Sequence, residues 1–147
     1  MSGLSPRLAA VVDALPLRTG MRVLEIGGAP GAAAREVARR IGPGGHVLVV
    51  DRSARGIALT SRNAAEEIRD GRLSVRRVAV EELVLLPGEA PYDLAFAVRV
   101  GALDGRHPTA GERALPRIAA ALVPGGRLLV DGGDPLRDVD LRPAPLV

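Results

Sequence analysis

The sequence predicts an α/β protein of three layers, in which helices cover both faces of a mostly parallel sheet. Two observations carry this prediction. Short apolar runs alternate with segments of helical periodicity along the 147 residues. The run from His46 to Val50 is almost continuously apolar and β-branched, which is typical of a strand covered on both faces. We expect one domain, 1–147, with an N-terminal helix within 1–20, a core over 21–131 and a tail over 132–147.

The elements follow from periodicity and from residues that begin or end helices. Ser5 and Pro6 predict a helix start, because Ser caps the first turn and Pro suits its first position. Pro116 is expected to kink or divide the last helix. Val139 and Leu141 alternate with charged residues, so a short edge strand is one interpretation of this segment. We expect helices over 6–15, 31–41, 53–68 and 109–122, a helical turn over 81–83, and strands over 22–26, 46–50, 72–78, 92–98 and 127–131.

The composition excludes several classes of function. The chain holds no Cys and no Lys, which excludes disulfides, thiolate metal sites, a Cys nucleophile and a P-loop, and no metal cluster is expected. All 20 basic residues are Arg, scattered among 17 acidic ones, and Tyr92 and Phe96 are the only aromatics, which argues against a nucleic-acid partner. No apolar stretch approaches the ~20 residues of a membrane span and no signal-peptide pattern is present, so we expect a cytoplasmic protein without a membrane partner.

The stretch from Glu25 to Gly31 joins the first expected strand to the helix that follows. Its glycines let the backbone bend sharply and lie close to a ligand. The following helix directs its partially positive end toward the same place. Asp51 ends the second expected strand, and 97–101 ends the fourth. Because ligands of such sheets bind beyond the carboxyl ends of the strands, the pattern predicts a nucleotide-type site at this edge.

Taken together, these motifs resemble the class I S-adenosylmethionine-dependent methyltransferases. The resemblance rests on residues 25–31, 47–53, 91–96 and 122–130 and spans about residues 22–131. It implies a Rossmann-like fold with about five strands in the order 3-2-1-4-5, and S-adenosylmethionine as cofactor. The family's C-terminal strand hairpin has no counterpart in the 16 residues after Asp131. We therefore expect a short form, whose fifth strand is covered by the tail or by a second copy in a homodimer.

The resemblance also implies which residues bind the cofactor. Glu25 would bind its ammonium group or organise the turn, and Asp51 would accept hydrogen bonds from the ribose hydroxyls. Ala29 stands where the family most often has a glycine, and the family's usual acid near the adenine is missing, so that Glu81 or the backbone of Val80 takes its place. The implied cofactor site consists of Glu25, Gly27, Gly28, Ala29, Gly31, Asp51, Arg52, Val80, Glu81 and Val98.

The expected methyl acceptor is a small molecule. Arg99, just beyond the fourth strand, is a candidate to bind an anionic substrate, although Asp131 or Asp104 could equally be its partner. His107 is a candidate base, with an ordinary surface role as the alternative. No catalytic side chain is visible, because methyl transfer from a sulfonium can proceed chiefly by positioning donor and acceptor in line.

Other interpretations stay open. Glu25 could pair with Arg22, and Asp51 could cap the following helix. A nicotinamide-dependent oxidoreductase shares the glycine turn and the ribose acid, but Ala29 and Ala32 occupy two of the three glycine positions of its fingerprint. The third interpretation is a truncated methyltransferase-like domain that binds the cofactor weakly or pairs with another chain without catalysis.

Overall fold

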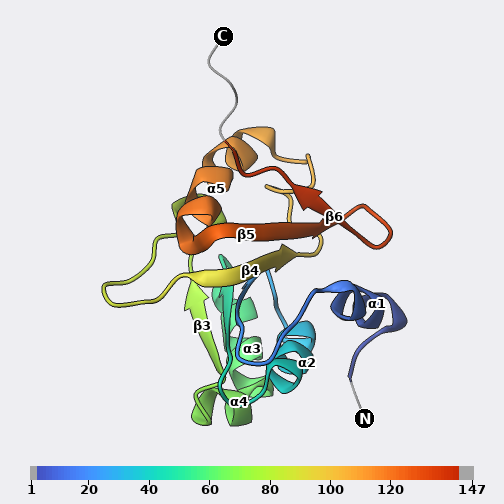
Figure 1. Cartoon of the computed structure of the whole chain (residues 1–147), viewed down its shortest axis with the longest axis vertical. Helices are drawn as coiled ribbons and strands as arrows, with labels where there is room; N and C mark the ends of the chain where they lie inside the picture. Colours follow the sequence, from blue (N-terminus) through green and yellow to red (C-terminus); the bar gives the residue numbers. More distant parts are fainter. Residues whose placement is uncertain (1–2, 143–147) are drawn as a thin grey trace.

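A single sheet of six strands, in the order β3-β2-β1-β4-β5-β6, forms the centre of the computed structural model, which describes residues 3–142 (Figure 1). The first five strands are parallel and the sixth returns antiparallel along β5. The predicted order 3-2-1-4-5 is confirmed, with one strand more than the five expected. The strands are β1 (Arg22–Ile26), β2 (His46–Asp51), β3 (Leu73–Arg77), β4 (Tyr92–Ala97), β5 (Leu122–Asp131) and β6 (Leu136–Val139).

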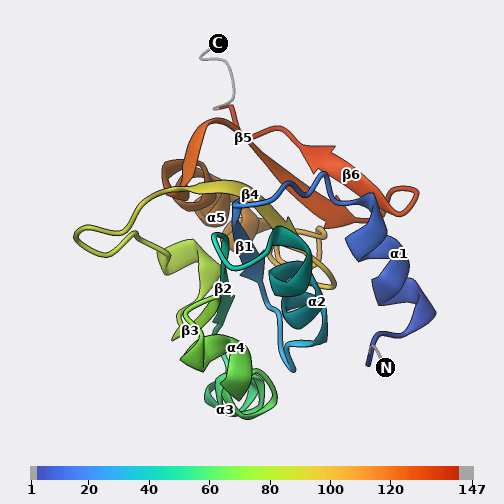
Figure 2. The same ribbon diagram turned by 60° about the horizontal axis from the view of Figure 1, so that its bottom comes forward.

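Helices cover both faces of this sheet, as the sequence predicts. Alternate residues of each strand point to opposite faces, so Val23 packs in the core under α1 and α2, while Leu24 packs in the core under α5. Figure 2 shows α2 in front of the sheet and α5 behind it. The helices are α1 (Pro6–Ala14), α2 (Ala32–Ile41), α3 (Ala54–Asn63), α4 (Ala65–Arg69) and α5 (Pro108–Ala121), with a 3₁₀ turn η1 (Val80–Glu82). Within residues 3–142, none of these helices has the length and apolar character needed to cross a membrane.

The structure corrects the sequence-based elements at several points. The helix expected over 53–68 is two helices, because the backbone leaves helical geometry at the fully buried Ala64. Helix α5 is continuous through Pro116, so the expectation that Pro116 divides this helix is wrong. Strand β5 begins at Leu122 rather than Arg127, and its register against β4 shifts between Tyr92 and Leu94. This irregularity in the pairing allows β5 to contain Pro124-Gly125-Gly126, a sequence that is typical of a turn.

The outer edge of β5 is covered by the chain's own tail. Leu128 to Asp131 pair with Val139 to Leu136 of β6, and Arg127 and Asp138 form an ion pair of 2.7 Å across the two strands. In Figures 1 and 2 the two strands lie side by side along one edge of the sheet. The edge strand that the sequence left open is therefore present, but it ends before Leu141. Of the two predicted covers for β5, the tail is the one observed, and the homodimer stays a prediction.

Candidate functional site

The glycine turn after β1 has a backbone that only glycine adopts easily. Gly27 and Gly31 have φ angles of +69° and +100°. A Cβ on Gly27 would lie 2.8 Å from Cγ2 of Val100, and one on Gly31 would lie 3.0 Å from Cγ2 of Thr60. Side chains at either position would therefore collide with the segment after β4 or with α3. Gly31 directly precedes α2 and shapes its start, but it lines neither of the two cavities described below.

Glu25 is a buried carboxyl group beneath this turn. Its residue is 4% exposed, and its Oε1 has no hydrogen-bond partner within the described part of the chain. A Cβ on Gly28 would lie 2.6 Å from the Glu25 Cδ, so the bare backbone of Gly28 rests directly on the carboxyl. Burial, and secondarily the negative charge of Asp51, raise the pKa of Glu25 to about 8. Such a group is unsatisfied until a proton or a cation reaches it.

Arg22 does not provide that cation. Its guanidinium lies 4.5 Å from the centre of the Tyr92 ring and donates hydrogen bonds to the carbonyls of Ala90 and Pro91. The alternative in which Glu25 pairs with Arg22 is therefore wrong. Glu25 instead lines a cavity of about 430 Å³ between the glycine turn and α1, to which Ser5 contributes as well.

Asp51 ends β2 and takes no part in capping the next helix with its carboxylate. Its Oδ1 accepts a hydrogen bond of 2.9 Å from the Ser53 backbone nitrogen, whereas the Ser53 hydroxyl caps α3 by accepting from Gly56. A Cβ on Gly56 would lie 2.9 Å from the Ala29 Cβ and 3.4 Å from the Asp51 Cγ. The methyl group of Ala29 thus rests against α3, where Gly56 leaves room for it. Gly56 is the signal in the sequence for this contact, because glycine is unfavourable within a helix and its presence in the first turn of α3 indicates close packing.

A larger cavity, of about 900 Å³, lies beyond the carboxyl ends of β1, β2 and β4. Gly27 and Arg99 line both cavities, so the two are adjacent. The smaller cavity brings together Glu25, Gly28, Ala29 and Val98. The larger one brings together the remaining predicted site residues, which are Asp51, Arg52, Val80, Glu81 and His107. Apart from Gly31, the residues chosen from the sequence therefore surround one continuous depression.

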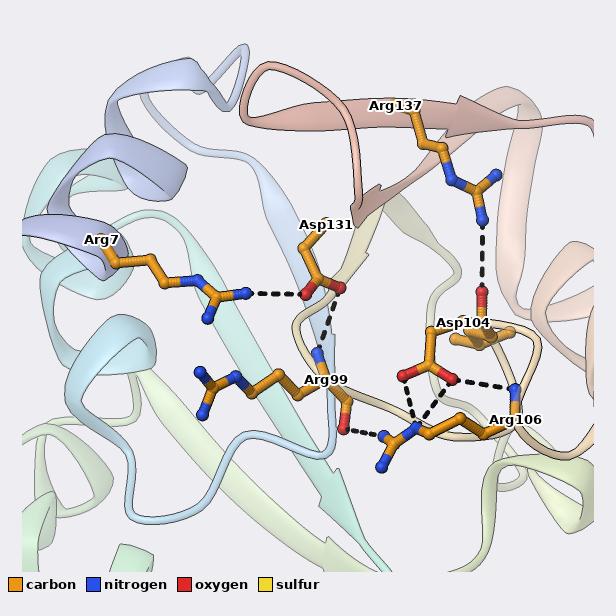
Figure 3. A network of polar contacts seen from close by, with 7 residues as sticks. Arg7, Arg99, Asp104, Arg106, Asp131 and Arg137 are labelled. Atoms are coloured by element: carbon orange, nitrogen blue, oxygen red, sulfur yellow. Dashed lines mark hydrogen bonds and ion pairs between the residues drawn. The ribbon is translucent and has the colours of Figure 1, made fainter.

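Arg99 is held by its backbone in an unusual conformation at the junction of the two cavities (Figure 3). Its φ of +58° makes it the one residue other than glycine with positive φ within 3–142. Its nitrogen donates to Oδ1 of Asp131 over 3.1 Å, and its carbonyl accepts from Arg106 over 3.0 Å. Asp131 also accepts a hydrogen bond of 3.3 Å from Arg7 of α1. Asp131 is thus a partner of the Arg99 backbone rather than of its guanidinium, and Asp104 is a partner of Arg106, at 2.8 Å.

His107 precedes α5 and packs on Gly101. A Cβ on Gly101 would lie 3.0 Å from the His107 Nε2, so the ring occupies the space that this glycine leaves. The other histidine, His46, lies at the start of β2 and contacts the Gly71 carbonyl and the Ser74 hydroxyl at 2.8 Å each. No group of three or more side chains suited to a metal ion occurs within residues 3–142.

The fold and the two cavities place a glycine turn and an acidic residue at the carboxyl edge of a parallel sheet, where proteins of this architecture bind their ligands. Residues 23–126 match the family profile described as a methyltransferase domain. The chain therefore belongs to the class I S-adenosylmethionine-dependent methyltransferases, a family whose cofactor is S-adenosylmethionine. This membership decides against the nicotinamide-dependent oxidoreductase.

Individual relatives differ in their acceptors. The chain is 32% identical over 136 residues to a protein-L-isoaspartate O-methyltransferase of Methanothrix thermoacetophila, covering 92% of this chain and 59% of that one. It is 35% identical over 114 residues to the ubiquinone/menaquinone biosynthesis C-methyltransferase UbiE of Bordetella avium, covering 78% and 41%. A solved phosphoethanolamine N-methyltransferase 2 of Haemonchus contortus, in complex with S-adenosyl-L-methionine, superimposes with a TM-score of 0.67 at 28% identity, covering 84% of this chain and 27% of that chain. The chain spans about 40 to 60% of the length of these curated relatives.

Proposed function

We propose that this protein transfers a methyl group from S-adenosylmethionine to a small-molecule acceptor. The observation that carries the proposal is the buried, unpartnered carboxyl of Glu25 beneath Gly28. A cationic group entering the smaller cavity would satisfy it, and the ammonium group of the cofactor's methionine part has the required charge. The bare backbone of Gly27 and Gly28 allows that part of the cofactor to approach closely.

The larger cavity is suited to the adenosine part. Asp51 ends β2 at its wall, and within the described residues its Oδ2 takes no hydrogen bond, so this oxygen can accept one from a ribose hydroxyl. Val80 is 7% exposed and belongs to the core under α5, so it offers an apolar surface to the base. Arg52 and Glu81 lie at the same wall. Ala29 and Val98 complete the smaller cavity.

The chemistry requires little from protein side chains. The bound cofactor supplies an electrophilic methyl group on a sulfonium. The chain's own task is to hold the acceptor in line with that group and to keep water away from it. His107 lies at the wall of the larger cavity, where its imidazole can accept a proton from an acceptor hydroxyl or amine.

Cavity size supports a small acceptor. About 900 Å³ has to hold both the adenosine part and the acceptor, which leaves space for a molecule of modest size. The acceptors named for the relatives include a protein residue and a quinone precursor. We favour the small molecule because this one cavity takes its lining from the ends of β1 and β2, from η1 and from the β4–α5 segment.

Calorimetric titration with S-adenosylmethionine, S-adenosylhomocysteine and NAD(P) tests the cofactor site. We expect micromolar binding of the first two, at least tenfold weaker in Asp51→Ala and unchanged in Asp70→Ala, which removes an exposed carboxylate from a turn outside both cavities. Absence of binding by the first two ligands would overturn the proposal. Formation of S-adenosylhomocysteine with a panel of amines, phenols, carboxylates and phosphate esters tests transfer. Binding without turnover across that panel would favour the non-catalytic interpretation instead.

A further inference from the structure

The larger cavity has an asymmetric distribution of charge. Its charged residues at the ends of β2 and η1 are mixed in sign, with Asp51, Glu81 and Glu82 beside Arg52. The lining from Arg99 to Arg113 contributes three arginines and no acid. This segment therefore carries an excess of positive charge, which favours a negatively charged ligand.

Two of these arginines have no partner of their own. Arg106 is neutralised by Asp104, with an ion pair of 2.8 Å that lowers the pKa of the Asp104 carboxyl, mainly through the hydrogen bond from Arg106. Within residues 3–142, the guanidinium groups of Arg99 and Arg113 form no hydrogen bond or ion pair. Arg113 stands four residues after Thr109 on α5, and both face the cavity, as does Ala110 between them.

The backbone of Arg99 is fixed where it enters the cavity. A positive φ is unfavourable for a residue with a side chain, and here contacts with Asp131 and Arg106 hold it from both sides. Figure 3 shows the Arg99 side chain directed away from both of its neighbouring carboxylates. Strain that surrounding contacts maintain is characteristic of functional positions. In this conformation the guanidinium is free to pair with a ligand.

We propose that Arg99 and Arg113 bind a carboxylate or phosphate group of the methyl acceptor. The proposal rests on the function proposed above and names its substrate class. Guanidinium groups match the two oxygens of a carboxylate or phosphate with paired hydrogen bonds. The anion then holds the acceptor at the segment between β4 and α5, which also carries His107.

Binding to protein saturated with S-adenosylhomocysteine tests the proposal without requiring turnover. The probes are inorganic phosphate, phenyl phosphate, benzoate and phenol, titrated by calorimetry. We expect phenyl phosphate or benzoate to bind at least tenfold more tightly than phenol, and the ratio of these two distinguishes a phosphate from a carboxylate acceptor. Arg99→Gln and Arg113→Gln should each weaken the anionic probe about tenfold. Arg117→Gln, which removes an exposed arginine one turn further along α5 and outside the cavity, should leave the affinity unchanged.

The outcomes separate this inference from the proposed function. If S-adenosylhomocysteine binds and the anions bind no better than phenol, or if Arg113→Gln binds them like the unchanged protein, the acceptor inference is wrong while the cofactor site stands. Tight binding of a single-stranded RNA 12-mer, lost in Arg113→Gln and without binding of the small anions, would likewise overturn it. If S-adenosylhomocysteine itself does not bind, the proposed function fails first. Arg113→Gln should change the affinity for S-adenosylhomocysteine less than twofold.

Discussion

The stability of the ligand-free protein should fall as the pH rises from about 5 to about 8, because the carboxyl of Glu25 is buried without a partner within the described residues. Its pKa rises from 4.5 to about 8 in the folded state, mainly through burial. Between these pH values the folded protein binds one more proton than the unfolded chain, so raising the pH favours unfolding. The stabilisation is complete below pH 4.5 and is lost as the pH passes through about 8.

The size of the effect follows from the pKa. Each pKa unit corresponds to about 1.4 kcal/mol, so a shift from 4.5 to about 8 withdraws about 5 kcal/mol from the free energy of unfolding. A domain of this size has a total of roughly 5–15 kcal/mol. Glu25→Gln keeps the shape of the side chain and removes the titration, so above pH 8 the variant should be the more stable protein.

Urea denaturation followed by circular dichroism, at pH values from 5 to 8.5, measures this difference. The comparison is between the unchanged protein and Glu25→Gln, because all other titrating groups cancel. Glu112→Gln, which changes an exposed carboxyl on α5, is the matched control and should show no such trend. A difference between the protein and Glu25→Gln that stays constant over this range would refute the reasoning.

Two further predictions concern single contacts. Gly28→Ala should destabilise the protein by about 1–3 kcal/mol and weaken S-adenosylhomocysteine binding more than tenfold, because its Cβ would lie 2.6 Å from the Glu25 Cδ. The control is Gly44→Ala, whose new Cβ would have nothing within 4 Å. This control should change the free energy of unfolding by less than about 0.5 kcal/mol. Tyr92→Phe removes a hydrogen bond of 2.6 Å to the Glu89 carboxylate and should lower the unfolding free energy by about 1.5 kcal/mol, as measured by urea denaturation. Equal stability of Gly28→Ala and Gly44→Ala, or an unchanged midpoint in Tyr92→Phe, would contradict these expectations.

Local patterns were sufficient to predict the strands that hold the site. The limits of β1 are those read from the sequence, because a short apolar run between Gly20 and Gly27 leaves little choice. Helix α5 and the break at Ala64 were harder. Pro116 is tolerated because tertiary packing overrides a local preference, and Ala64 is as good a helix former as its neighbours, so nothing local marks it.

The candidate cofactor residues could be chosen from the sequence because their signals are consecutive, and their binding of the cofactor stays a prediction. Glu25 and the glycines after it occupy one turn, and Asp51 ends the next strand. Of the two arginines proposed to bind the acceptor, only Arg99 could be chosen from the sequence. Arg99 stood out by its place after β4, whereas Arg113 reads as one more polar residue on a helix whose facing direction depends on how α5 packs. The fixed backbone of Arg99 depends on Asp131, which is 32 residues away.

The ion pair between Arg7 and Asp131 joins residues separated by 124 positions. During synthesis on the ribosome, α1 is made first and waits until β5 has emerged before this contact can form. Contacts of such separation form late, since the intervening chain must already be organised. Because α1 provides one wall of the smaller cavity, the surroundings of Glu25 combine residues from the start of the described chain with the segment after β4. Ligand binding at that cavity therefore reports contact between the first helix and the segment after β4.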